Sequence, residues 1–119
     1  MSEAFVSPRF PFTVEHDGVA FECVSMSAGE RALVGRAAER GADGEVTAIG
    51  VEGLSHAVRF GLKSWKSING SVVPEFSANM DRNLERLSDD AYLEVAKKVI
   101  EVSFMTEEDR RNLTLPQQS

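Results

Sequence analysis

Apolar and polar side chains alternate over residues 12–24, around a central Asp17-Gly18 pair, and this pattern restricts the fold more than any other part of the chain. Asp-Gly favours the two-residue turn of a β-hairpin, because both residues tolerate a positive φ there. The register that this turn predicts pairs Phe12 with Cys23, Val14 with Phe21 and His16 with Val19. The apolar side chains then share one face of the hairpin. A hairpin alone is marginally stable in water, so the remaining chain must cover this face.

A helix is predicted directly after the hairpin. The run Ser27-Ala-Gly-Glu30 is a capping box, in which the serine and glutamate side chains each satisfy a free backbone N–H group of the other residue. The helix should therefore begin near Ala28. Its apolar stripe consists of Leu33, Val34, Ala37 and Ala38, and Gly41 can end it with a positive φ.

A second helix is predicted from a helical repeat of apolar residues. Asp43 can cap it, and the residues that recur along one face are Val51, Leu54, Val58, Leu62 and Trp65. The glycines in this stretch each cost about 1 kcal/mol relative to alanine inside a helix. Residues 43–52 are therefore left open between helix, loop and strand, and the helix is predicted from residue 54 to residue 65.

A turn is expected to separate this helix from two more. Asn69-Gly70 favours positive φ and Pro74 disfavours helix in the residue before it, so residues 69–74 are predicted as a turn followed by an extended segment. The helices that follow are a short one capped by Ser77, through Met80, Leu84 and Leu87, and a longer one capped by Ser88, from Asp89 to about Met105.

The last of these helices has a wide apolar face. Its polar face is narrow and consists of Glu94, Lys97, Lys98 and Glu101. The apolar side chains span an arc of roughly 200°, where ~100° is enough for a surface helix. They are Tyr92, Leu93, Val95, Ala96, Val99, Ile100, Val102 and Phe104. A helix of this kind either lies at the centre of a fold or presents one side to a partner.

These segments predict an α+β fold, mainly helical, in which an N-terminal β-hairpin packs on a bundle of about four helices. A chain of 119 residues fits one domain, which we place at residues 11–113. Residues 1–10 are expected to form a flexible N-terminus and residues 114–119 a disordered tail.

Composition excludes several classes of partner. The chain has 13 basic and 19 acidic residues and a net charge of -6, which repels nucleic acid and anionic membrane surfaces. It shows neither a signal peptide nor an apolar run of membrane-spanning length. Cys23 is the only cysteine, so an internal disulfide is excluded and a reducing cytoplasm is the expected compartment.

No pattern in the sequence predicts catalysis or a cofactor. Neither His16 nor His56 has the spacing of a metal site with Cys, Asp or Glu. Ser55 lies in a Gly-Leu-Ser-His-Ala run that lacks the preceding buried strand of a nucleophile elbow. The glycines of residues 41–44 are not followed by the Lys-Ser or Lys-Thr of a phosphate-binding loop. We therefore expect a protein that is not an enzyme and that binds no cofactor or metal.

Trp65 is the residue most worth singling out. It is the only tryptophan and ends an apolar stripe, so a core position is favoured and a partner-facing anchor is the alternative. Phe76 is expected to pack beside it. The candidate partner-binding residues are Trp65, Phe76, Tyr92, Val95, Val99, Val102 and Phe104.

The second half of the chain, roughly residues 54–113, resembles the tail assembly chaperones of long-tailed bacteriophages. The segments that carry the resemblance are Leu62-Lys-Ser-Trp65, Ile68-Asn-Gly70, Val73-Pro-Glu-Phe76-Ser77, Asn83-Leu-Glu-Arg-Leu87 and Glu108-Asp-Arg-Arg-Asn112. The chain departs from that pattern at Ser64, where a glycine commonly precedes the tryptophan, and at Glu75, which separates the proline from the phenylalanine.

This resemblance implies a chaperone in the cytoplasm of the bacterial host that is absent from the finished virion. Such a protein binds the tape-measure protein, keeps it soluble and helps to bring tail-tube subunits to it, without a cofactor. A homo-oligomer is left open. The alternatives are a structural tail or head-completion protein and, against the net charge of -6, a small DNA-binding regulator.

Overall fold

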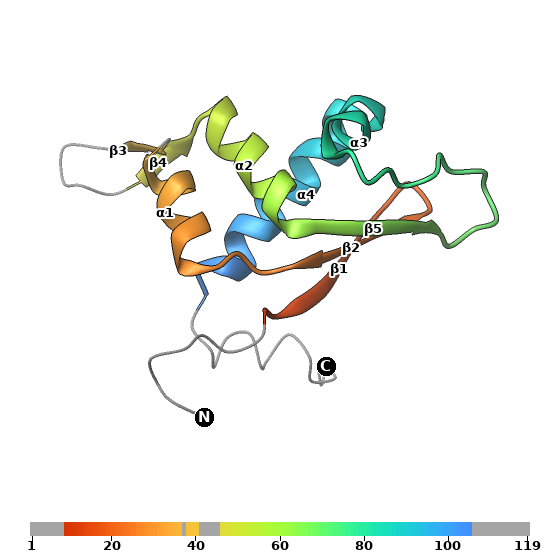
Figure 1. Cartoon of the computed structure of the whole chain (residues 1–119), viewed down its shortest axis with the longest axis horizontal. Coiled ribbons are helices and arrows are strands. Elements are labelled where there is room, and N and C mark those ends of the chain that lie inside the picture. The colour runs from red at the N-terminus through yellow and green to blue at the C-terminus, as the bar shows by residue number, and fades with distance from the viewer. Residues whose placement is uncertain (1–8, 37, 41–45, 106–119) are drawn as a thin grey trace.

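The computed structural model describes residues 9–36, 38–40 and 46–105 and begins with the predicted hairpin (Figure 1). Strand β1 (Pro11–His16) pairs antiparallel with β2 (Val19–Val24). The register is the predicted one, with Phe12 opposite Cys23, Val14 opposite Phe21 and His16 opposite Val19. Both turn residues have positive φ, 49° at Asp17 and 76° at Gly18, as a type I′ turn requires. The hairpin prediction is confirmed.

A third strand extends this sheet where the sequence predicted helix. Helix α2 (Val51–Gly61) ends before Leu62, and β5 (Leu62–Ser67) pairs antiparallel with β2, giving the order β1-β2-β5. Ser64 lies opposite Glu22 and Leu62 opposite Cys23, so Lys63 is an extra residue in β5. This bulge lets Leu62 and Trp65 point to the same side of a strand although they are three residues apart. The prediction that the helix reaches Trp65 is therefore wrong, because a bulged strand gives these two residues the same spacing as a helix.

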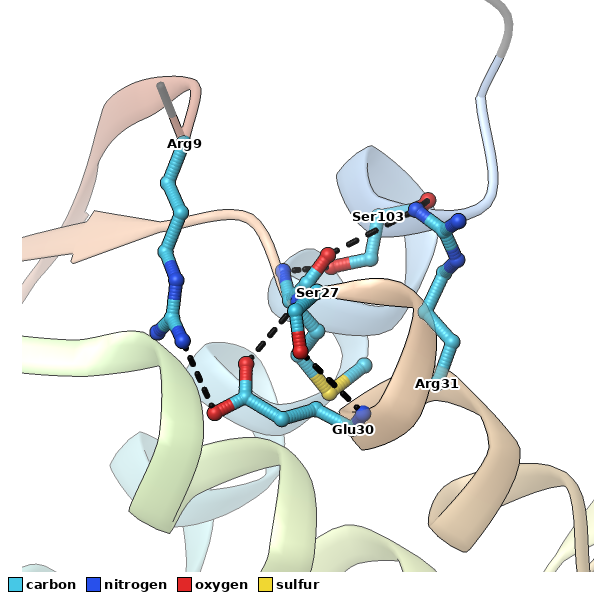
Figure 2. A network of polar contacts seen from close by, with 6 residues as sticks. Arg9, Ser27, Glu30, Arg31 and Ser103 are labelled. Atoms are coloured by element: carbon cyan, nitrogen blue, oxygen red, sulfur yellow. Dashed lines mark hydrogen bonds and ion pairs between the residues drawn. The ribbon is translucent and has the colours of Figure 1, made fainter. Parts of the chain in front are cut away.

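Helix α1 (Ala28–Arg36) starts as predicted but is shorter. In its capping box the Ser27 N–H donates to Glu30 Oε1 at 2.9 Å, and the Glu30 N–H donates to Ser27 Oγ at 3.3 Å (Figure 2). Arg9 adds an ion pair to the other carboxylate oxygen of Glu30 at 3.1 Å. The helix ends at Arg36, and a strand begins at Ala38. Val34 is buried, as the predicted stripe requires, whereas Leu33 is exposed.

A small second sheet follows α1. Strand β3 (Ala38–Arg40) pairs antiparallel with β4 (Val46–Ile49), and α2 begins immediately afterwards. The prediction that Ala38 belongs to the first helix is therefore wrong. For the open stretch 43–52, the described part forms a strand and then the start of a helix. Ala37, Gly41 and Asp43 lie outside the described residues.

Two further helices complete the described chain. After an irregular segment over residues 68–79, α3 (Met80–Arg86) is capped by Asn79, whose side chain accepts the Asp81 N–H at 3.0 Å. Ser77, the predicted cap, instead accepts the Asn79 N–H. Helix α4 (Asp89–Ser103) has the predicted cap, because Ser88 Oγ accepts the Ala91 N–H at 3.1 Å. It ends two residues before the predicted Met105.

Helix α4 lies at the centre of the structure. It packs against α2 and against β1 and β2, while the hairpin turn and the segment after β5 lie at the far end of the sheet (Figure 1). Its side chains Val95, Ala96, Val99 and Val102 are all 0% exposed. Val95, Ala96 and Val99 form one core cluster with inward side chains of the sheet and of α1 and α2, chiefly Val14, Phe21, Cys23, Val34, Val58 and Leu62. The predicted α+β architecture of a hairpin packed on helices is confirmed.

Gly61 lets α2 and α4 approach each other closely. A Cβ atom at Gly61 would lie 2.5 Å from Val99 Cγ2 and 2.6 Å from Val99 Cγ1. Carbon atoms in van der Waals contact are separated by about 3.5–4.0 Å, so no other residue fits here unless the Val99 side chain or one of the two helices moves. Gly61 is also the last residue of α2, just before the chain enters β5.

A polar cluster ties the end of α4 to the segment between β2 and α1. The buried Met26 N–H donates to Ser103 Oγ at 2.8 Å, across 77 residues of sequence. Arg31 donates from Nη1 to the backbone oxygens of Ser103, at 3.4 Å, and Met26, at 3.5 Å (Figure 2). A cation at the C-terminal end of a helix is favourable, because the backbone oxygens there carry partial negative charge.

The Cys23 thiol is 3% exposed, and burial, with a smaller effect from Glu22, raises its pKa from 9.0 to about 12. Below pH 9 the thiol is protonated in both the folded and the unfolded chain. Between pH 9 and 12 the unfolded chain loses this proton and the folded protein keeps it, so the free energy of unfolding should fall across that interval. Urea denaturation should therefore show that the free energy of unfolding decreases more between pH 7.5 and pH 10 in the wild type than in Cys23→Ala. Equal losses in the two proteins would contradict this prediction.

Candidate functional site

Trp65 lies in the middle of an aromatic cluster on the inner face of the sheet. Its ring meets Phe76 edge-on, with centroids 4.8 Å apart, and meets Phe21 edge-on at 6.1 Å. Its indole N–H donates to the Pro74 backbone oxygen at 2.6 Å. Aromatic pairs with this geometry stabilise a fold by about 0.5–1.5 kcal/mol beyond their buried area. The predicted neighbourhood of Trp65 and Phe76 is thus present.

Side chains of α3 hold the segment around Phe76 in place. Asn83 is 0% exposed, and its amide forms two hydrogen bonds with the backbone of Ser77. Its Oδ1 accepts the Ser77 N–H at 2.7 Å, and its Nδ2 donates to the Ser77 oxygen at 2.9 Å. Arg86 donates from Nη1 to the Glu75 oxygen at 2.7 Å. Together with the Trp65 indole, these contacts fix the segment that carries Phe76.

An open apolar groove lies beside Trp65, and we call it the Trp65 groove. It has a volume of about 220 Å³ and lies between the hairpin turn, the segment after β5 and the junction of α3 with α4. Most of its wall is apolar, contributed by Val19, Phe21, Trp65, Val73, Pro74, Leu87 and Ala91. The remaining lining residues are His16, Asp17, Arg86 and Ser88.

Exposed apolar residues continue outwards from the groove. Val72, which directly precedes the lining residue Val73, is 99% exposed, and Ile68 is 50% exposed on the same segment. An apolar groove that is joined to exposed apolar side chains is typical of a surface that binds another molecule. This arrangement is the strongest candidate site in the part of the chain that the structure describes.

The structure places the predicted partner-binding residues in three different environments. Trp65 lines the groove, and Phe76 contacts its ring without lining the groove itself. Val95, Val99 and Val102 are fully buried, because α2 covers one side of α4 and the sheet covers the other. These valines therefore belong to the core and present no surface to a partner.

The other two predicted residues lie on the same helix. Tyr92 is partly buried against the core. Phe104 is 54% exposed just beyond the end of α4, thirteen positions after the groove residue Ala91. At 1.5 Å per residue, this separation places the two ends of the helix roughly 20 Å apart. Phe104 and the Trp65 groove are therefore not parts of one contact surface.

Sequence reasoning missed several residues that shape this site. Asn83 and Arg86 belong to a predicted short helix and to one run of the resemblance, but the sequence did not predict their contacts with the backbone of Ser77 and Glu75. Leu87 and Ala91 line the groove from the α3–α4 junction, which no local pattern places beside a hairpin turn. Arg82 and Arg86 stand four residues apart, a spacing that puts them on one side of α3 and was visible in the sequence.

Ser55 and the two histidines make ordinary structural contacts. Ser55 lies within α2 and accepts a hydrogen bond from Arg59 Nε at 3.2 Å. His56 stacks on Phe60 and lies 3.6 Å from a Glu52 carboxylate oxygen. His16 lies 3.5 Å from an oxygen of Asp17 at the edge of the groove.

Among the described residues, no group of three or more His, Cys, Asp or Glu side chains could hold a metal ion. None of the helices in that part of the chain is both long and apolar enough to cross a membrane. Compared with protein-family models, with curated proteins and with solved structures, the chain finds no match.

Proposed function

We propose that this protein binds other proteins through the Trp65 groove and acts as a phage tail assembly chaperone in the cytoplasm of the bacterial host. In this role it binds the tape-measure protein, keeps it soluble and helps to recruit tail-tube subunits, without catalysing a reaction. The open apolar groove beside the only tryptophan is the observation that carries the proposal. The resemblance over residues 54–113 supports the identity of the partner.

The groove suits a client protein that exposes apolar side chains. Its walls come from the hairpin, from the segment after β5 and from the α3–α4 junction, all of which pack on one core. A groove that is already formed binds a partner side chain at a smaller entropic cost than one that must first be ordered. The net charge of -6 keeps the protein dispersed while an apolar surface is exposed.

Co-expression with the tape-measure protein of the same phage tests this function. The wild-type chain should raise the soluble yield of that protein severalfold and elute with it from a sizing column. Val73→Glu, which places a charge in the groove, should abolish most of this gain. Val51→Glu is the matched control, because Val51 is 82% exposed at the start of α2 and lies outside the groove.

An unchanged soluble yield, with no complex on the column, would contradict the chaperone function. Mass spectrometry of purified phage particles separates the main alternative, because a structural tail or head-completion protein remains in the particle and a chaperone does not.

A further inference from the structure

A second, polar cavity lies next to the Trp65 groove, and we call it the arginine pocket. It has a volume of about 300 Å³ and is lined by Glu75, Phe76, Ser77, Ala78, Arg82 and Arg86. Arg86 lines both cavities. The two rings of the Trp65–Phe76 pair, which are in edge-on contact, line one cavity each. The groove and the pocket are therefore neighbouring parts of one surface.

The arginine pocket has unused capacity to bind an anion. Arg82 and Arg86 lie on the same side of α3, and both are exposed. Within the described residues neither forms an ion pair, although Glu75 lines the same pocket. Arg86 uses one nitrogen for the Glu75 backbone oxygen, and a guanidinium has five N–H donors. Both arginines can therefore donate to a carboxylate.

A neighbouring arginine shows that charge pairing is available on this side of the protein. Arg59 of α2 pairs with Asp81 of α3 at 2.5 Å. Arg82, the next residue along α3, has no such partner among the described residues. Like charges four residues apart on a helix destabilise it by some tenths of a kcal/mol, and a bound anion removes this repulsion. The free pair is thus complementary to negative charge.

We propose that the Trp65 groove and the arginine pocket form one docking site for an acidic amphipathic segment of a partner protein. An apolar side chain of that segment enters the groove, and a carboxylate beside it binds Arg82 and Arg86. This inference rests on the proposed function as a protein-binding chaperone and specifies the chemistry of the bound segment. The net charge of -6 alone would favour basic peptides, so a preference for an acidic segment would be due to the local arginine pair.

Two synthetic helical peptides test this preference directly. Both have 18 residues, the same stripe of leucines and no tryptophan, and they differ only in carrying glutamate or lysine beside the stripe. Binding to the full-length protein is followed through the fluorescence of Trp65. The glutamate peptide should bind at least fivefold more tightly than the lysine peptide. Equal or tighter binding of the lysine peptide, or binding of neither peptide, would overturn the proposal.

Two variants that each remove one positive charge test whether the preference for the glutamate peptide comes from the arginine pocket. Arg82→Gln should weaken binding of the glutamate peptide about three- to tenfold. Arg36→Gln, at the end of α1 and outside both cavities, changes the net charge equally and should have no effect. Equal weakening by the two variants would show long-range attraction only and would overturn the docking site.

The same variants separate this inference from the proposed function. If the glutamate peptide binds as expected and the tape-measure protein gains no solubility, the docking site stands and the chaperone function fails. If the tape-measure complex forms and Arg82→Gln leaves it unchanged, the chaperone function stands and the acidic docking site is overturned.

Discussion

Replacing Gly61 with alanine is expected to lower the free energy of unfolding by about 2–3 kcal/mol, at the upper end of the usual cost of overpacking a core. The new Cβ would lie 2.5 Å from Val99, so α2 and α4 must separate or Val99 must leave its position. Val99 is fully buried and has little room to move. Urea denaturation followed by the fluorescence of Trp65 measures the loss.

A second glycine provides the control with the opposite sign. Gly35 lies in α1, and a Cβ there meets nothing within 4 Å. Gly35→Ala should therefore raise the free energy of unfolding by about 0.5–1 kcal/mol, because alanine restricts the unfolded chain and favours helix.

A double mutant tests the stated cause. Val99→Ala removes Cγ1 and Cγ2, the two atoms closest to the new Cβ, and leaves only Val99 Cβ at 3.1 Å. Gly61→Ala should therefore cost at least about 1 kcal/mol less in that background than in the wild type. Strictly additive losses would show that the clash with Val99 is not the reason for the glycine.

Replacing Asn83 with alanine is expected to cost about 2–4 kcal/mol of stability and to disturb the groove. The change removes both hydrogen bonds to Ser77, which are partly buried, and a backbone group that loses its partner away from water costs about 1–3 kcal/mol. The segment that carries Phe76 should then leave Trp65, so the emission of the folded protein should shift to longer wavelength. Fluorescence spectra and urea denaturation measure the two effects.

We call the two hydrogen bonds between the Asn83 amide and the Ser77 backbone the Asn83 clamp. Two further variants show whether this clamp causes the expected changes in stability and emission. Asn79→Ala removes the cap of the same helix, should cost only about 1 kcal/mol and should leave the Trp65 emission unchanged. Asn83→Asp keeps an acceptor for the Ser77 N–H but places a carboxylate oxygen against the Ser77 oxygen, so it should be destabilising as well. An Asn83→Ala protein with wild-type emission and stability would refute the role assigned to this residue.

The Asn83 clamp also links stability to the proposed binding surface. Pro74 lines the Trp65 groove, Phe76 lines the arginine pocket, and both belong to the segment that Asn83, Arg86 and Trp65 hold. Peptide binding should therefore be weaker in Asn83→Ala even where the protein remains folded. Binding energy would then be spent on ordering the segment again.

The structural predictions that held are those that depend on local interactions. The hairpin register follows from Asp17-Gly18, the start of α1 from the Ser27–Glu30 box and the start of α4 from Ser88, all within a few residues. One local prediction failed, because Asn79 and not Ser77 caps α3. The failed prediction of a helix up to Trp65 depends on a partner far along the chain. Leu62 and Trp65 have the spacing of a helix, and only the pairing of β5 with β2 and the bulge at Lys63 make them strand residues.

The candidate site could likewise be predicted only where it depends on residues that are close in the sequence. Its aromatic pair, Trp65 and Phe76, could be anticipated because the residues are close in sequence. The burial of the α4 valines could not be predicted from the sequence. The same apolar residues are needed whether a partner or the protein's own sheet covers that face of the helix.

The sequence by itself determined the local elements of this protein: a hairpin in one register, two helix starts and a turn at Gly70, where φ is 82°. Backbone sterics and side-chain caps act over a few residues, so these features needed no distant partner. Only the tertiary structure decided that α4 is buried and that the groove lies where the hairpin turn meets the α3–α4 junction. Those outcomes depend on which apolar surfaces cover one another, and that choice is made between segments far apart in the sequence, such as β1 and α4.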